Sequence, residues 1–297
     1  MKKRSELKIR LTAGLVALMK GLARLPLPWL RRLGTALGEL LWWVARSRRH
    51  IVLTNLRHCM PELTEAQRRR LARAHLHCFG RSVLDRAWLW HAPAQVLAQR
   101  LRWVGPTEEL QAPGPMILLA PHFAGLDAGG TAVARDVRGP VAFIFSRQSN
   151  PAIDQWVQQG RERFGNVRPC YRHEGMRQIV AGLRRGEPLH LSPDMDLGPQ
   201  ESVFVPFFGV PAATAPSLSR MARVGDARVV PVVTRMTDAG YEVQVYPAWT
   251  DFPSQDPVAD TLRMNQAIEG WIRQMPEQYH WVHRRFKSRP PGAPSLY

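Results

Sequence analysis

Hydrophobic and polar positions divide the chain into alternating helical and extended segments that follow a basic amino-terminal region. Thr64 and Gln67 have the spacing of a capping box, which predicts that a helix begins there and runs to about Ala92. Short apolar runs at Met116–Leu119 and Val141–Phe145 predict buried strands. Further helices are predicted at 150–164, 176–186 and 256–275, and further strands near 189–192, 203–205, 228–233 and 241–246. This alternation predicts an α/β fold, in which helices cover a sheet.

Residues 1–60 mix basic and apolar positions in a way that sets them apart from the rest of the chain. Residues 1–50 alone hold twelve Lys and Arg side chains against two acidic ones. No uncharged run approaches the roughly 18–20 residues that span a bilayer, because Lys20 and Arg24 interrupt the first apolar stretch and Pro26 follows it. We expect a basic amphipathic helical region at 1–60 that associates with an anionic membrane, and a folded domain at 61–297. A basic helix packed on the protein's own core is the alternative.

The whole chain is strongly basic. Its 41 Lys and Arg against 24 Asp and Glu give a formal net charge of +17, which implies an anionic partner such as nucleic acid, a membrane or an acidic protein. Charge alone suggests a nucleic-acid-binding protein, but the basic residues are mixed with apolar ones and no recognition motif is present. The sequence has no P-loop and no G-x-G-x-x-G, so no nucleotide cofactor is expected. The three cysteines lack metal-site spacing, which indicates reduced thiols.

His122 and Asp127 are the main candidates for catalysis. They follow the first predicted strand, and strand ends are where α/β folds place their chemistry. A histidine can take a proton from a hydroxyl near neutral pH, and a carboxylate can hold its ring in the correct tautomer. Residues five apart lie about 140° from each other on a helix, so the pairing requires a turn. Gly125 and the pair Gly129-Gly130 provide the backbone freedom for one. The same spacing also arises by chance around ordinary histidines.

Other polar residues form weaker candidate sites. Asp194 stands just past the predicted strand near 189–192, either in an ordinary turn or in an active-site rim that holds an arginine or a substrate group. Five arginines lie between the two candidate regions and suggest an anion-binding wall, although arginines on helix surfaces are usually solvated. They are Arg147, Arg161, Arg163, Arg172 and Arg177. The histidine pair near the carboxyl terminus offers too few ligands for a metal, and no metal is expected. The serine hydrolase elbow G-x-S-x-G is absent.

Five segments carry a family resemblance when they are taken in order. They are the H-x4-D motif at 122–127, the segment 145–161 around Asn150-Pro151, Pro193–Gly198, Val203–Gly209 with Thr214, and Pro276–Pro290. Together they resemble the late acyltransferases of lipid A biosynthesis, the lauroyl and myristoyl transferases, a branch of the lysophospholipid acyltransferase superfamily. In many members a glycine-asparagine-aromatic step precedes the acidic residue, whereas this chain has Ala124-Gly125-Leu126. The resemblance implies a central mixed β-sheet flanked by helices, as in glycerolipid acyltransferases.

The resemblance also implies an activity and its participants. A fatty acyl chain would pass from acyl carrier protein to a hydroxyl of a lipid A precursor, with His122 as general base and Asp127 orienting it. Backbone N–H groups of the helix after Gly129, or Arg161, would stabilise the oxyanion. The substrate-binding residues would be Arg147, Arg161, Arg172 and Asp194. No cofactor and no nucleic acid would take part.

The same resemblance implies attachment to anionic lipid at the cytoplasmic face of the inner membrane. The attachment would be peripheral or through a weak amino-terminal anchor, since charges and prolines break the leading helix. Acylation of a lysophospholipid or an aminoacyl lipid, with acyl-CoA as a possible donor, is the alternative within the superfamily.

Overall fold

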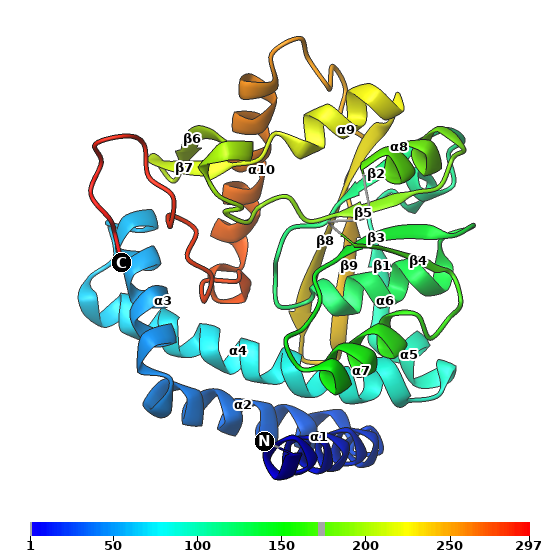
Figure 1. Cartoon of the computed structure of the whole chain (residues 1–297), viewed down its shortest axis with the longest axis vertical. Helices are drawn as coiled ribbons and strands as arrows, with labels where there is room; N and C mark the ends of the chain where they lie inside the picture. The colour runs from blue at the N-terminus through cyan, green and yellow to red at the C-terminus, as the bar shows by residue number, and fades with distance from the viewer. Residues whose placement is uncertain (1, 172–175) are drawn as a thin grey trace.

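A seven-stranded sheet forms the centre of the computed structural model, which describes residues 2–171 and 176–297 and side chains from Thr12 onward. The strand order is β1-β9-β8-β2-β5-β3-β4 (Figure 1). The strands are β1 (Leu101–Val104), β2 (Met116–Leu119), β3 (Val141–Phe145), β4 (Val167–Tyr171), β5 (Leu189–Leu191), β8 (Arg228–Thr237) and β9 (Gly240–Val245). All neighbours are parallel except β8 and β9, which pair antiparallel. The prediction of an α/β fold with a mixed central sheet is confirmed.

Helices cover both faces of this sheet (Figure 1). The helices are α1 (Lys2–Leu22), α2 (Leu27–Val44), α3 (Arg46–Cys59), α4 (Glu65–His91), α5 (Ala94–Arg100), α6 (Leu126–Asp136), α7 (Pro151–Arg161), α8 (Met176–Arg184), α9 (Ser217–Gly225) and α10 (Pro257–Gln274). One face carries α6 and α7, which contact α4, and the other carries α8, α9 and α10. Alternate strand residues serve the two faces, so Ile117 and Leu119 pack toward α8–α10 while Met116 and Leu118 pack toward α6.

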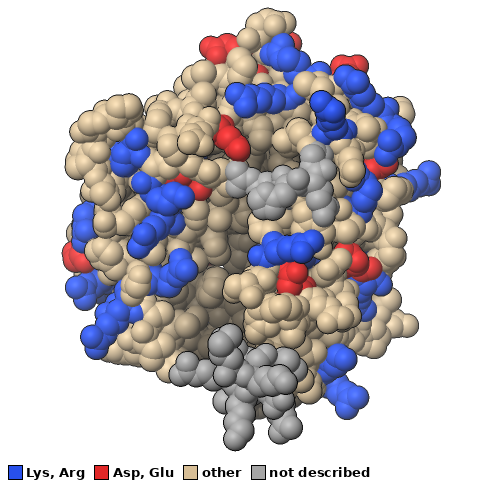
Figure 2. Space-filling view, viewed as in Figure 1, with Lys and Arg blue, Asp and Glu red and all other residues tan. Residues whose placement is uncertain are grey.

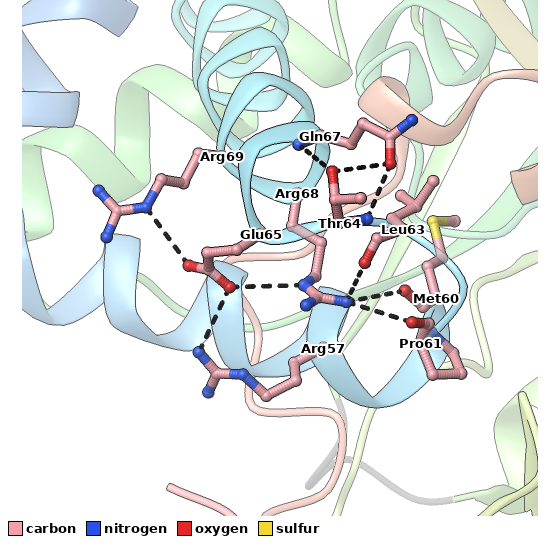
Figure 3. Close-up of polar contacts among 9 residues, drawn as sticks. All are labelled: Arg57, Met60, Pro61, Leu63, Thr64, Glu65, Gln67, Arg68 and Arg69. Carbon is pink, nitrogen blue, oxygen red and sulfur yellow. Dashed lines mark hydrogen bonds and ion pairs between the residues drawn. The ribbon is translucent and has the colours of Figure 1, made fainter.

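The amino-terminal end of α4 has the predicted capping box (Figure 3). Gln67 donates its backbone N–H to Oγ1 of Thr64, and its side-chain oxygen accepts the backbone N–H of Thr64 at 2.8 Å. Arg68 donates to the carbonyl groups of the turn that joins α3 to α4. These contacts satisfy backbone groups that a helix terminus leaves without partners, which explains why the helix begins where the sequence predicts.

The predicted strands and helices at 116–119, 141–145, 150–164, 176–186, 189–192 and 256–275 are confirmed, with small shifts at their ends. The structure adds elements that the sequence pattern does not reveal. They are β1, β4, α5, α9 and the second strand of a separate antiparallel hairpin, β6 (Val203–Phe207) and β7 (Val210–Thr214).

The glycines near Asp127 have a different role from the predicted one. Helix α6 begins at Leu126, immediately after Gly125, so Gly129 and Gly130 lie inside the helix and form no turn. Both allow close packing instead. A Cβ atom at Gly129 would lie 2.2 Å from Oγ1 of Thr234, which only the absence of a side chain permits. The prediction of a turn at this glycine pair is therefore wrong.

Helix α2 crosses α4 at very short range. A Cβ atom added at Gly80 of α4 would lie 2.2 Å from the carbonyl oxygen of Gly34, and one added at Gly38 would lie 2.3 Å from that of Leu76. Arg31 of α2 is also buried, 3.1 Å from the carboxylate of Asp85. The contact is therefore an integral part of the folded chain.

The outer side of this amino-terminal region presents large apolar side chains to solvent. The exposed ones are Leu15, Leu18, Trp29, Leu33, Leu40, Trp43 and Val44. Among the helices in the described part of the chain, none combines the length and the apolar character needed to cross a membrane.

Candidate active site

His122 stands between the end of β2 and the start of α6. Its Nδ1 lies 2.7 Å from Oδ1 of Asp194, and its backbone N–H donates to Oδ2 of the same carboxylate at 3.0 Å. Asp194 follows β5, the strand directly beside β2, so parallel pairing brings the two strand ends and these two side chains together. Asp194 is fully buried and the imidazole is 23% exposed. The carboxylate thus holds Nδ1 and leaves Nε2 available to a group in the cavity.

The motif spacing predicts that Asp127 holds His122, but in the structure it does not. Its Oδ2 accepts a hydrogen bond from Arg86 at 2.7 Å, and its Oδ1 accepts two from Arg161, the shorter at 2.8 Å. Within the described residues no hydrogen bond links it to the imidazole. The physical reason is that α6 starts at Leu126, so Asp127 projects from the first helical turn toward α4 and α7. The pairing predicted from the H-x4-D motif is corrected to His122–Asp194.

Both carboxylates are ionised well below neutral pH. Burial raises the pKa of Asp194, but the charge of His122 and its hydrogen bonds outweigh burial and hold that pKa well below its usual range. Burial likewise raises the pKa of Asp127, and the guanidinium groups of Arg161 and Arg86 hold it well below that range. The site therefore contains two carboxylates. Asp194 is hydrogen-bonded to His122, and Asp127 is paired with two arginines.

A carboxyl-terminal segment fixes the loop that carries His122. The carbonyl of Gln278 accepts the N–H of Ala124 at 2.7 Å, and the N–H of His280 donates to the carbonyl of His122 at 2.9 Å. Burial raises the pKa of the Tyr279 hydroxyl well above its ordinary value, and the charge of Asp194 raises it further. We name residues 278–283 the C-terminal strap. It holds the backbone at His122 and Ala124 in place.

His122 opens into a cavity of about 1210 Å³. The lining is mostly apolar and comes from α6, β3, α8 and α9, with Arg161, Arg177, Arg184 and Arg220 among the charged members. A pocket for one drug-sized ligand has roughly 300–1,000 Å³, so this cavity has room for more than one chain. The face of the molecule in Figure 2 is hollowed near its centre, with Lys and Arg side chains on both rims. An apolar cavity beside an imidazole suits a substrate with a fatty chain.

The remaining predicted site residues lie in different places. Arg161 lines the cavity, whereas Arg147 is exposed and lies over the ring of Tyr171, 4.8 Å from its centroid. Arg172 falls outside the described residues. Asp194 is in the site, where it is hydrogen-bonded to His122 and not, as predicted, to an arginine or a substrate group.

Sequence reasoning missed Arg86 and His190. Arg86 occurs in a long helix rich in arginine, so nothing local marks it as a site residue. His190 lies in β5, where its ring stacks on Phe143, and a histidine between two leucines in a strand was an available signal. In the described residues, no group of three or more His, Cys, Asp and Glu side chains is placed to hold a metal ion.

Comparison with known proteins shows the family of the chain. A sequence profile described as "Bacterial lipid A biosynthesis acyltransferase" matches residues 2–288 of the chain. The chain belongs to this family. Members of the family are acyltransferases, so the predicted enzyme class is confirmed, as is the family resemblance.

Individual relatives cover most of the chain. It is 34% identical over 281 residues to "Lipid A biosynthesis lauroyltransferase" of Escherichia coli (strain K12), which spans 92% of this chain and 90% of that protein. It is 32% identical over 291 residues to "Lipid A biosynthesis myristoyltransferase" of the same organism, spanning 95% and 88%. A third relative, "Lipid A biosynthesis palmitoleoyltransferase", is 30% identical over 281 residues, spanning 92% and 90%. The relatives' names thus differ in the acyl chain that each protein transfers.

Proposed function

We propose that this protein transfers a fatty acyl chain from acyl carrier protein to a hydroxyl of a lipid A precursor. The acceptor is the hydroxyl of a 3-hydroxyacyl chain already on the precursor, and the product is a secondary acyloxyacyl group. Family membership supports the reaction class. The single observation that carries the chemistry is the His122–Asp194 pair at the wall of a large apolar cavity.

In the proposed mechanism His122 is the general base. Nδ1 donates to Asp194, so Nε2 removes the proton of the acceptor hydroxyl as its oxygen attacks the thioester carbonyl. A new C–O bond forms and the C–S bond breaks, and the imidazolium returns the proton to the departing thiolate. Asp194 stabilises the imidazolium in between, as the acid of a Ser-His-Asp triad does. The transfer is direct and forms no covalent enzyme intermediate.

Arg161 is our candidate for stabilising the oxyanion of the thioester carbon. It lines the cavity, and Asp127 holds its guanidinium through two hydrogen bonds. The start of α6 contributes a partial positive charge beside His122. The sequence predicts that backbone N–H groups of a helix after Gly129 stabilise the oxyanion. In the structure that helix begins earlier, at Leu126. Asp127 then serves as a positioning residue for the arginine and not as the partner of the base.

The charge and the exposed apolar residues support the proposed partners and location. Acyl carrier protein is acidic, the precursor carries phosphates and the inner leaflet is anionic, so a chain with net charge +17 attracts all three. Trp29 and Trp43 are 58% and 63% exposed on α2, and aromatic residues of this kind suit a membrane interface. We propose peripheral attachment to the cytoplasmic face of the inner membrane through this region.

The test is an acyl-transfer assay with purified full-length protein, acyl carrier protein charged with a fatty acid, and a lipid A precursor in vesicles. Wild-type protein should add one acyl chain, detected as a mass increase in the product. His122→Ala should lose about 10²–10⁴-fold in rate while its circular dichroism stays unchanged. Parallel reactions with acyl-CoA as donor and with a lysophospholipid as acceptor decide between the family alternatives. No transfer to any precursor by the folded wild-type protein would contradict the proposal.

A further inference from the structure

The cavity that contains His122 meets solvent beside helices α8 and α9. Several residues of these helices line the cavity and are exposed at the same time, so they lie at its opening. The two helices contact each other, and Nε of Arg184 donates to the carbonyl of Val224 at 3.1 Å. We name the exposed lining residues that carry the argument the α8/α9 rim. They are Met176, Arg177 and Arg184 of α8 and Arg220 and Val224 of α9.

The positive charge of this rim has no carboxylate bound to it. Within the described part of the chain, Arg177, Arg184 and Arg220 form no ion pair, and the bond from Arg184 goes to a neutral carbonyl. Neither α8 nor α9 contains an acidic residue, and at the opening Glu201 is the acidic residue that faces the three arginines. Figure 2 shows Lys and Arg side chains at the upper right of this face, where Figure 1 places α8 and α9. The rim therefore attracts an anionic partner.

The rim also presents apolar side chains among its arginines. Met176 is 54% exposed and Val224 is 47% exposed. Methionine and arginine are both enriched in protein–protein interfaces, where apolar contacts are surrounded by polar and charged ones. A site for a phosphate group alone would gain nothing from exposed apolar residues. This combination fits the surface of an acidic protein.

The rim lies far from the region that we propose for membrane attachment. Helix α2, with the exposed Trp29 and Trp43, lies near the bottom of Figure 1, whereas α9 lies near the top. Under attachment through α2, the rim is remote from the lipid contact and open to a soluble partner. Its position favours a protein over lipid head groups.

We propose that the α8/α9 rim is the surface on which acidic acyl carrier protein docks to deliver its thioester. This inference rests on the proposed function and adds to it the place where the donor binds. Acidic side chains of the carrier contact the three arginines of the rim, and apolar ones cover Met176 and Val224. The thioester enters the cavity past the rim, because the rim residues and His122 line the same cavity. Charge complementarity of this kind increases the rate of encounter.

The experiment measures binding of fluorescently labelled, fatty-acylated carrier protein to the full-length protein by anisotropy, without acceptor. Arg177→Glu combined with Arg220→Glu should raise Kd about tenfold or more at low ionic strength, because attraction becomes repulsion. Increasing the ionic strength from about 0.05 to 0.3 M should weaken wild-type binding and reduce this difference, since salt screens exposed charges. Arg102→Glu combined with Arg138→Glu is the matched control. It makes the same change in net charge at exposed positions outside the cavity lining, and should change Kd by less than about twofold.

A second variant tests the apolar part of the rim. Met176→Ser combined with Val224→Ser should weaken binding severalfold, because the carrier then covers less apolar surface. The loss should be the same at both ionic strengths, since no charge is changed. Wild-type affinity in this variant would remove Met176 and Val224 from the proposed interface.

The inference fails if the double arginine variant binds the carrier as wild type does, or if the matched control weakens binding equally. It also fails if the double arginine variant keeps its affinity for the carrier but loses vesicle binding or raises KM for the precursor, which would assign the rim to lipid phosphates. If that variant does not fold, Arg177→Gln combined with Arg220→Gln should show a smaller loss with the same salt dependence. Wild-type protein that accepts no acyl group from the carrier contradicts the proposed function instead. The two failures are therefore distinguishable.

Discussion

Nδ1 of His122 lies 2.7 Å from the carboxylate of Asp194, a residue 72 positions further along the chain. Asp127, only five positions away, is held by two arginines on other helices. Sequence proximity therefore misidentifies the partner of His122. The pairing arises from the sheet, where β5 lies beside β2, and the two strand ends deliver the two side chains to one point.

The two carboxylates should respond differently to neutralisation. Asp194→Asn removes the anion on Nδ1 and offers the imidazole the wrong tautomer, so kcat should fall by about 10²–10⁴-fold. Asp127→Asn leaves the His122–Asp194 bond in place and loosens Arg161, so its kcat should fall less. Pre-steady-state acyl transfer by quenched flow measures both. Equal losses in the two variants would contradict the division of roles.

Stability should fall on mild acidification because four histidines, two buried and two partly buried, are uncharged in the folded chain. Burial lowers the pKa values of His190 and His280 to about 3 and those of His75 and His283 to about 4. The unfolded chain binds protons at these histidines below about pH 6.5 while the folded chain does not. Their stabilising contribution is therefore complete above pH 6.5 and is lost as the pH falls from there toward 4.

Urea unfolding at pH 7.5, 6 and 5 measures this effect. The free energy of unfolding should decrease by a few kcal/mol across the range, with a limit of about 1.4 kcal/mol per pH unit for each histidine. His75→Gln should reduce the slope, and the exposed His50→Gln should not change it. A wild-type unfolding free energy that is flat from pH 7.5 to 5 would contradict the prediction.

The close crossing of α2 and α4 should tolerate no added methyl group. Gly80→Ala would place a Cβ atom 2.2 Å from the carbonyl oxygen of Gly34, so the helices must separate. We expect a loss of about 1–3 kcal/mol in the free energy of unfolding, as for other overpacked contacts. Gly270→Ala in α10 is the control, since a Cβ atom there meets nothing within 4 Å and should stabilise the helix by about 0.5–1 kcal/mol. Thermal unfolding of both variants tests the contrast.

Exposed tryptophans on α2 should contribute to membrane binding. Replacing Trp29 and Trp43 with serine removes two side chains that are more than half exposed, and should weaken binding to vesicles of phosphatidylglycerol and phosphatidylethanolamine by about tenfold or more. Val258→Ser, also at an exposed apolar position but on α10, should bind like wild type. Vesicle flotation measures both. Equal binding by the double variant and wild type would place the membrane contact elsewhere.

Local patterns predicted much of this fold. The capping box at Thr64 and the buried strand before His122 depend on residues next to each other in sequence, and both are confirmed. Strands with mixed exposure, such as β4, lack the apolar run that marks a strand and were missed. Glycines give an ambiguous signal because they occur both in turns and at close contacts. At Gly129 the structure has a close contact with Thr234 and no turn.

The tertiary partners of the candidate residues were harder to predict than the candidate residues themselves. His122 and Asp194 were both candidates, but their pairing depends on strand order, which no local pattern contains. Arg86 and Arg161 reach Asp127 from two separate helices, and a charged residue on a helix gives no sign of whether it meets solvent or another side chain. Charge composition suggests an anionic partner but does not indicate which arginines would contact it.

The C-terminal strap has a consequence for synthesis of the protein. A ribosome that has translated the chain through α10 has not yet delivered Gln278 or His280, the residues that fix the loop around His122. Residues 1–60 are by then already synthesised, so under the proposed membrane attachment the nascent polypeptide would reach anionic lipid before it could perform chemistry. A product cut short by premature termination or clipped near its end would sit at the bilayer as an inert occupant.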